Sequence, residues 1–197
     1  MDVVHTLRAL LTGAPHLILG GRSPIRAGNE RLASVRLGVK GLPSLLLEST
    51  AFDAGGPIPS RYTADGGEVP PPLVWRELPE GTRSLVLIAE DPDAPLPQPF
   101  VHWIALMPSG TRGLGVLPGD DRAEVEMGRT TTLRTGWVGC APPRGDSAHH
   151  YHFQLFALDR VLPLGMHPGR SELLREMRGH VLGFGELVGT YQRGPVH

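Results

Sequence analysis

Short apolar runs separated by turn residues follow one another from Leu45 to near the end of the chain. Runs of this length, several of them continuously apolar, are typical of strands in a sheet that is covered on both faces. Glycine and proline pairs between the runs exclude a continuous helix and require exposed connections. The pattern predicts a mainly β, antiparallel protein with long loops, and it places strands at residues 45–47, 85–89, 101–107, 151–158 and 187–191.

One segment of this region has helical spacing instead. Ser171 can cap a helix, and Glu172 is favourable in the first turn that follows. The apolar positions that recur at intervals of three and four are Leu173, Leu174, Met177, Val181 and Leu182. This spacing predicts a helix from Ser171 to about Val188, weakened in its second half by Gly183 and Gly185.

The first 44 residues differ in composition from the rest. They hold six Lys or Arg residues against Asp2 and Glu30, a net charge of +4. A short amphipathic helix near the N-terminus is predicted by Val3, Leu7, Leu10 and Leu11. Residues 20–44 show no periodicity and are predicted to form an extended basic arm. We therefore divide the chain into an N-terminal helix and arm, residues 1–44, and one domain, residues 45–197.

The apolar face of the predicted N-terminal helix has to be buried against another surface. Because that helix carries a single basic residue, Arg8, we expect it to dock on protein rather than on a membrane, and a homodimer would supply that surface. We expect no signal peptide, since Arg8 and Pro15 interrupt the apolar run. No run reaches the ~18 apolar residues of a transmembrane helix. The single cysteine, Cys140, rules out an internal disulfide and fits a reducing compartment, so we expect a cytoplasmic protein.

The overall charge bears on the class of partner. The chain carries 19 Lys or Arg residues and 20 Asp or Glu residues, so its formal net charge is −1. Proteins that bind nucleic acid through its phosphates carry a broad basic excess. We therefore expect no nucleic-acid partner. Gly-x-Ser-x-Gly and phosphate-loop motifs are absent from the sequence, so neither serine hydrolysis nor nucleotide hydrolysis has support.

Polar residues that could do chemistry gather in two stretches. The first is Asp91-Pro92-Asp93-Ala94-Pro95, which follows an apolar strand and precedes His102 in the next strand. The second is His149-His150-Tyr151-His152, which opens another strand just after the loop at Pro142-Pro143. Both stretches lie beside loops that can shape a cavity.

Alternation along a strand divides the second stretch between two faces. His149 and Tyr151 point one way, and His150 and His152 point the other. If His149 and Tyr151 face a cavity together with His102, the site holds two imidazoles and a phenol, which donate hydrogen bonds to oxyanions. Asp91 would then hold one imidazole in a fixed tautomer and favour its charged form. This arrangement predicts a site for a small anion.

The opposite face leads to a different hypothesis. If His150 and His152 point inward, their spacing resembles the metal-ligand pair of cupin barrels, and the protein would be a metal-dependent enzyme. A hydrolase that uses His149 as its base is a related alternative. The glutamate that accompanies such a pair is missing, and no second histidine motif follows. We therefore expect no metal, no other cofactor and no enzymatic activity.

Taken together, these motifs resemble the phosphatidylethanolamine-binding protein family, also called the Raf kinase inhibitor protein family, in its bacterial branch. The resemblance covers about residues 45–193. It rests on Asp65-Gly66, Pro71-Pro72-Leu73, the stretch from Asp91 to Pro95, His102-Trp103, the Pro142-Pro143 loop followed by His149-His150-Tyr151, and the C-terminal MRGHVLGFGELVGTYQR of residues 177–193.

The resemblance implies a β-sandwich of one large and one small antiparallel sheet, with a C-terminal helix and a few short helices. It also implies a shallow pocket for phosphate-like groups. The residues expected to bind the anion are Asp91, His102, Gly139, Ala141, Pro142, His149 and Tyr151, and those expected to shape the pocket are Asp93, Pro95 and Pro143.

The expected function is that of a non-enzymatic module that binds phosphate or a phosphoryl headgroup such as phosphoethanolamine and regulates a protein partner. The chain departs from the eukaryotic branch in two places. His150 stands where that branch has Arg, and the mammalian C-terminal helix with its tyrosine has no counterpart after Tyr191. Kinase inhibition is therefore not carried over. The alternative is an interaction protein that inhibits a protease or kinase while its pocket stays unused.

Overall fold

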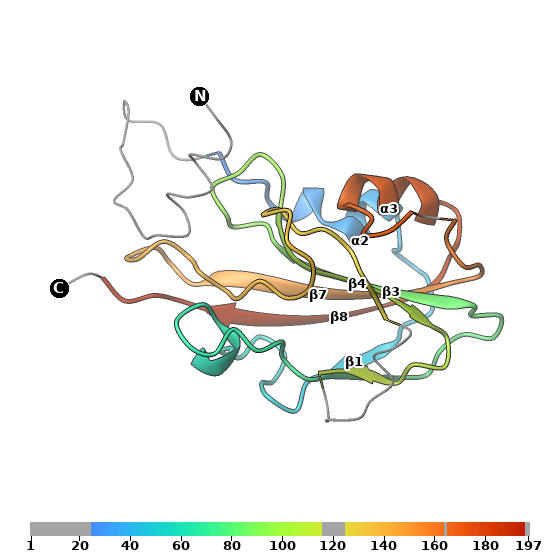
Figure 1. Ribbon diagram of the computed structural model, residues 1–197, viewed down its shortest axis with the longest axis horizontal. Coiled ribbons are helices and arrows are strands. Elements are labelled where there is room, and N and C mark those ends of the chain that lie inside the picture. Colours follow the sequence, from blue (N-terminus) through green and yellow to red (C-terminus); the bar gives the residue numbers. More distant parts are fainter. Residues whose placement is uncertain (1–24, 116–124, 164, 196–197) are drawn as a thin grey trace.

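The computed structural model of the protein describes residues 25–115, 125–163 and 165–195. These residues form two antiparallel sheets that face each other, with helices on the outer side of the larger sheet (Figure 1). The β-sandwich expected from the sequence is confirmed. The amphipathic helix predicted near the N-terminus lies outside the described residues, and the homodimer that it was expected to support stays a prediction.

The large sheet has five strands in the order β6-β4-β3-β7-β8, and all neighbouring pairs are antiparallel. The strands are β3 (Ser84–Asp91), β4 (Phe100–Pro108), β6 (Glu126–Met127), β7 (His149–Leu158) and β8 (Val181–Tyr191). β3 lies in the middle, and all of its residues are buried. Because the sheet is covered on both faces, its central strands need no polar alternation.

The small sheet has the order β1-β2-β5 and covers one face of the large sheet. Its strands are β1 (Leu46–Glu48), β2 (Leu73–Arg76) and β5 (Gly113–Leu114). Apolar side chains from both sheets fill the space between them. Trp75 of the small sheet belongs to the same cluster as Trp103 and Phe153 of the large sheet, and none of the three is more than 2% exposed.

A second core lies on the other face of the large sheet. Two helices cover that face, α2 (Ala33–Leu37) and α3 (Arg170–Met177), as Figure 1 shows. Phe156 of β7 clusters there with Leu173 and Met177 of α3, and all three side chains are fully buried. None of the helices in the described residues is long and apolar enough to cross a membrane.

Part of the predicted extended arm is helical. The 3-10 turn η1 (Asn29–Arg31) leads into α2, which packs on the large sheet through the fully buried Ala33. The prediction of an extended arm is therefore wrong for residues 29–37. A helix of five residues is too short to produce a periodic pattern, and it ends at once on Gly38 in the left-handed conformation.

One further 3-10 turn, η2 (Ser60–Tyr62), lies between β1 and β2.

Helix α3 is shorter than the sequence predicts. It begins after Gly169 and ends at Met177, so the helix predicted from Ser171 to about Val188 is wrong in its second half. The chain turns at Gly179, which has a φ of 81°, and continues as β8.

Strand pairing explains this difference. β8 pairs with β7 along nearly its whole length, which satisfies the backbone groups that a longer helix would otherwise satisfy. The glycines of β8 also allow residues 45 and 79 to approach the backbone of the strand closely. A Cβ on Gly185 would lie 2.6 Å from the carbonyl oxygen of Leu45, and a Cβ on Gly183 would lie 2.7 Å from Cγ of Pro79.

Glu90 joins the helices to the large sheet. Its side chain is fully buried on the outer face of β3. Its Oε2 accepts hydrogen bonds from the backbone amide of Ala33, at 2.8 Å, and from Nε2 of Gln154, at 2.7 Å. Its Oε1 accepts a hydrogen bond from Nε of Arg170 at the start of α3. One carboxylate therefore fixes the first residue of α2 and the first residue of α3.

Replacing Glu90 with alanine is expected to lower the free energy of unfolding by about 3 to 5 kcal/mol, because it removes one partner of a buried ion pair. Urea unfolding followed by circular dichroism measures the change. Glu48→Ala is the matched control, since Glu48 pairs with Arg76 at 2.8 Å on the surface and its loss is expected to cost less than about 1 kcal/mol. Equal losses in the two variants would contradict the role given to Glu90.

Candidate functional site

The carboxylate of Asp91 organises the end of β3. Its Oδ1 accepts hydrogen bonds from the backbone amides of Asp93, at 2.8 Å, and Ala94, at 3.1 Å, which fixes the loop that follows the strand. Its Oδ2 accepts a hydrogen bond from Nδ1 of His149, at 2.8 Å. His149 therefore carries a proton on Nδ1, as the sequence analysis expected for one imidazole of the site.

His149 opens β7, and its side chain is 1% exposed. Burial lowers the pKa of His149, but the hydrogen bond and charge of Asp91, with help from Asp146 and Asp93, raise it, and the resulting pKa lies above the ordinary value of 6.5. Within the described residues, the second nitrogen, Nε2, is buried without a hydrogen-bond partner. The nearest carboxylate oxygen, Oδ2 of Asp146, lies 3.5 Å away in an ion pair. The site thus holds an imidazole that favours its charged form, with Nδ1 bonded to Asp91 and with Nε2 near the Asp146 carboxylate but without a hydrogen bond among the described residues.

His102 in β4 is buried as well, but its charge state is different. Its Nδ1 lies 2.6 Å from the carbonyl oxygen of Val138, which can only accept, so Nδ1 carries the proton. Burial lowers the pKa of His102 below its ordinary 6.5, despite the raising effect of Asp91. The ring is therefore neutral at pH 7, and its Nε2 is an acceptor. The sequence predicted two imidazole donors in the site, whereas the cavity has one, His149.

These side chains meet at a cavity of about 30 Å³. Eight of the ten predicted site residues form its wall: Asp91, Pro95, His102, Gly139, Ala141, Pro142, Pro143 and His149. Ala94, Phe100 and Val138 complete the wall and were not predicted. Phe100 could have been found from alternation, because it precedes His102 by two positions on β4, and their ring centroids are 4.6 Å apart.

The other two predicted residues, Tyr151 and Asp93, are not part of the wall. Tyr151 is buried beside His102, with the ring centroids 5.1 Å apart and the rings edge to face. Its hydroxyl is buried without a hydrogen-bond partner in the described part of the chain, and burial raises its pKa, which keeps the phenol neutral. Asp93 instead accepts hydrogen bonds from the backbone amide and Nδ1 of His150, at 2.9 and 2.8 Å, and so fixes the start of β7.

The model of the family described as phosphatidylethanolamine-binding proteins matches residues 48–192. The chain belongs to the phosphatidylethanolamine-binding protein family. A UPF0098 protein of Pyrococcus horikoshii is 37% identical to it over 184 residues, which cover 90% of this chain and 85% of the relative. The match to the family therefore extends over nearly all of the sandwich.

Solved structures of two family members resemble this one. The phosphatidylethanolamine-binding protein homologue CT736 of Chlamydia trachomatis shares 34% sequence identity with the chain and superposes with a TM-score of 0.68, over 76% of this chain and 98% of that one. YbcL of E. coli has a TM-score of 0.69 over the same shares of the two chains, at 24% identity. The second likeness concerns the fold alone.

In this family member, the remaining histidines of the second motif lie away from the cavity. Nδ1 of His150 lies 2.8 Å from Oδ2 of Asp93, and Nδ1 of His152 lies 3.1 Å from Oε1 of Glu186. The two imidazoles therefore pair with different carboxylates. Across residues 25–115, 125–163 and 165–195, no group of three or more His, Cys, Asp or Glu side chains is arranged to hold a metal ion.

Gly139 and Cys140 bring the cavity wall close to the η2 turn. A Cβ on Gly139 would lie 2.5 Å from the backbone nitrogen of Ala64, so only glycine allows this approach. The amide of Gly139 donates to Oε1 of Glu68 at 3.1 Å. Cys140 is fully buried, and burial raises the pKa of its thiol well above the ordinary value, so the sulfur stays protonated and unreactive.

The opposite shifts of the two buried histidines lead to a testable difference. In an NMR titration of histidine ring protons, we expect the pKa of His149 above 6.5 and that of His102 below 6.5. Asp91→Asn removes the charge that stabilises the His149 imidazolium and is expected to lower the pKa of His149. Asp159→Asn is the matched control. It removes a carboxylate that pairs with a different histidine, His180, at 2.9 Å, and it is expected to leave the pKa of His149 unchanged. A His149 pKa that Asp91→Asn leaves unchanged would contradict this assignment.

Proposed function

We propose that this phosphatidylethanolamine-binding family member is a non-enzymatic binding protein whose small cavity takes phosphate or a phosphoryl headgroup such as phosphoethanolamine. The observation that carries the proposal is Nε2 of His149, a buried nitrogen on a ring with a raised pKa and without a hydrogen-bond partner among the described residues. Leaving a buried charged donor unpaired is costly, so an anionic acceptor in the cavity would stabilise it.

The other polar groups fit a phosphoryl group better than a fully ionised anion. The neutral His102 faces the cavity with an acceptor nitrogen, which can receive a proton from a monoprotonated phosphoryl oxygen or from the ammonium of phosphoethanolamine. The hydroxyl of Tyr151 lies beside His102 but outside the cavity wall, so we do not assign it to the anion. One donor, Nε2 of His149, and one acceptor, Nε2 of His102, thus match a group that carries both charge and a proton.

The carboxylate of Asp146 lies near this donor. Its Oδ2 lies 3.5 Å from Nε2 of His149 and accepts a hydrogen bond from Nη2 of Arg26 at 3.0 Å. Asp146 is not part of the wall of the cavity, but its carboxylate is the negative group that an anion at Nε2 of His149 would replace. In this proposal Asp146 is an internal competitor, and it keeps the affinity for free anions low.

Replacing His149 with alanine is expected to weaken phosphate and phosphoethanolamine binding by about 10- to 100-fold, the loss of one charge-assisted hydrogen bond. Calorimetry measures the affinity, and circular dichroism checks that the variant is folded. His180→Ala is the control, because His180 forms a comparable ion pair with Asp159.

Replacing Asp146 is expected to have the opposite effect on the anion affinity. Asp146 contributes to the raised pKa of His149, so the comparison is made at pH 5, well below the ordinary pKa of histidine, where Asp146→Ala is expected to raise the anion affinity. Unchanged affinity in the folded His149→Ala variant would refute the proposed site, whatever Asp146→Ala does.

The proposal also fixes the sign of the pH dependence. Because its pKa is raised, His149 loses its charge only as the pH rises above 6.5. The anion affinity is therefore highest below pH 6.5 and falls by about tenfold per pH unit above the raised pKa. Sulfate is the probe, because its own charge does not change between pH 5 and 9. It carries no proton for His102, so it is expected to bind more weakly than phosphate, and its pH dependence reports the charge of His149 alone. A sulfate affinity that stays constant over this range would contradict the role of His149.

A further inference from the structure

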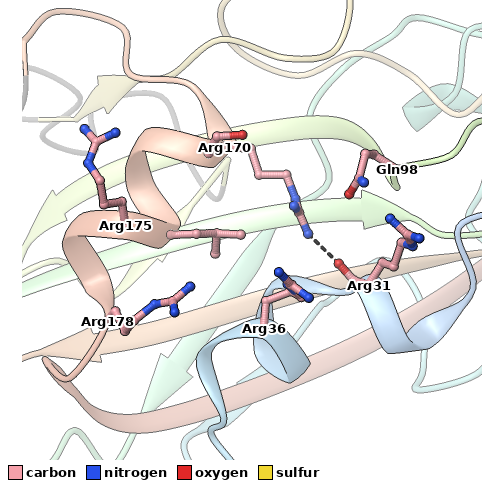
Figure 2. Close-up of a pocket in the computed structure, with 8 residues that line it drawn as sticks. Arg31, Arg36, Gln98, Arg170, Arg175 and Arg178 are labelled. Atoms are coloured by element: carbon pink, nitrogen blue, oxygen red, sulfur yellow. Dashed lines mark hydrogen bonds between the residues drawn. The ribbon is translucent and has the colours of Figure 1, made fainter.

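A second and much larger cavity, of about 650 Å³, lies on the outer side of the large sheet, between η1, α2 and α3. Figure 2 shows that its arginines come from both sides and surround one open space. We call it the arginine cleft. It is lined by Arg31, Arg36, Gln98, Arg170, Ser171, Leu174, Arg175 and Arg178. Five of these eight residues are arginines, none is acidic, and none lines the small cavity.

Two of the arginines have carboxylate partners. Arg170 pairs with the buried Glu90 and donates from Nη2 to the carbonyl oxygen of Arg31 at 2.5 Å, so its position is fixed (Figure 2). Nε of Arg175 lies 3.1 Å from Oε1 of Glu176. The positive charges of Arg170 and Arg175 are therefore neutralised by carboxylates of the protein itself.

The other three arginines have no such ion pair within the described residues. For Arg31, Arg36 and Arg178, no carboxylate of the described chain lies within ion-pair distance. All three are exposed at the cleft. Like charges gathered around one concavity repel each other, and a bound polyanion would remove this repulsion. The cleft therefore presents about three positive charges that a ligand can neutralise.

The start of α3 adds to the positive potential. Arg170 and Ser171 of its first turn line the cleft, and the N-cap residue, Gly169, has no side chain to cap the free backbone amides. Free amides at a helix N-terminus and a serine hydroxyl are donors that phosphoryl oxygens accept from. Glu172 lies in the same turn but not in the cleft wall.

We propose that the arginine cleft binds a compact ligand with two or more phosphoryl groups, such as pyrophosphate or a small bisphosphorylated metabolite. Guanidinium forks bind phosphoryl oxygens in pairs, and a volume of about 650 Å³ is in the range of small-molecule sites. The only apolar wall residue is Leu174, which is 8% exposed, and no aromatic side chain lines the cleft. A nucleobase or an acyl chain would find nothing to stack or pack on.

The test is calorimetry of the full chain with pyrophosphate and tripolyphosphate. We expect saturable binding of one ligand per chain. Arg36→Gln and Arg178→Gln are each expected to weaken it about tenfold, the loss of one charge-assisted contact, and the double variant is expected to weaken it more than either single variant. Arg76→Gln is the matched control, since Arg76 is an exposed arginine of the small sheet, and it is expected to bind as the unaltered protein does.

This site is separable from the one proposed above. His149→Ala is expected to leave tripolyphosphate binding intact, and the Arg36→Gln/Arg178→Gln variant is expected to leave sulfate binding at the small cavity intact. Tripolyphosphate affinity unchanged in the double variant, or equally reduced in Arg76→Gln, would overturn the assignment of the cleft. Tighter binding of duplex DNA or of vesicles rich in anionic lipid, lost in the double variant, would also overturn it, because the occupant would then be a macromolecular surface.

Discussion

The structure depends on two buried carboxylates that follow each other at the end of the central strand. Because successive side chains of a strand point to opposite faces, Glu90 and Asp91 serve different layers of the molecule. Glu90 fixes the helices on the outer face through the amide of Ala33 and the guanidinium of Arg170. Asp91 fixes its own loop and His149. Without compensation by these donors, two adjacent charges could not be buried in the middle of a sheet.

Each carboxylate determines the chemistry of one cavity. Asp91 raises the pKa of His149 and holds its Nδ1, so the small cavity is lined by one histidine that favours the charged form and by His102, which favours the neutral form. Glu90 holds Arg170 in place, which forms the inner wall of the arginine cleft and leaves the outer arginines to a ligand. In the two proposals, the first cavity takes a single phosphoryl group and the second takes several. Glu90 and Asp91 thus position side chains of both proposed sites.

Much of this could be predicted from the sequence. Apolar runs located β3, β4, β7 and the end of β8, and alternation correctly separated His149 and Tyr151 from His150 and His152. Short strands such as β5 and β6 contain too few residues to produce a pattern. The C-terminal helix was overextended because Val181 and its neighbours have helical spacing, whereas pairing with β7 determines their conformation.

The properties that define the two sites depend on tertiary contacts. The tautomer of His102 is set by the carbonyl of Val138, 36 positions away in the chain, and no local motif records that contact. The arginine cleft combines Arg31 and Arg36, which belong to the basic excess of the first 44 residues, with three arginines at and after α3, more than 130 positions later in the chain. The composition showed an excess of basic residues near the N-terminus, but only the fold shows that these two sets of arginines lie together.

If the buried His149 binds an anion in its charged form, the anion and the proton must bind cooperatively. The ¹⁵N chemical shifts of its ring nitrogens, recorded as a function of pH with and without saturating sulfate, test this coupling. We expect both nitrogens to be protonated at pH 6 and sulfate to raise the pKa of His149, because a ligand that binds the charged form stabilises it. A pKa that is the same with and without sulfate would show that no anion binds to the charged imidazole.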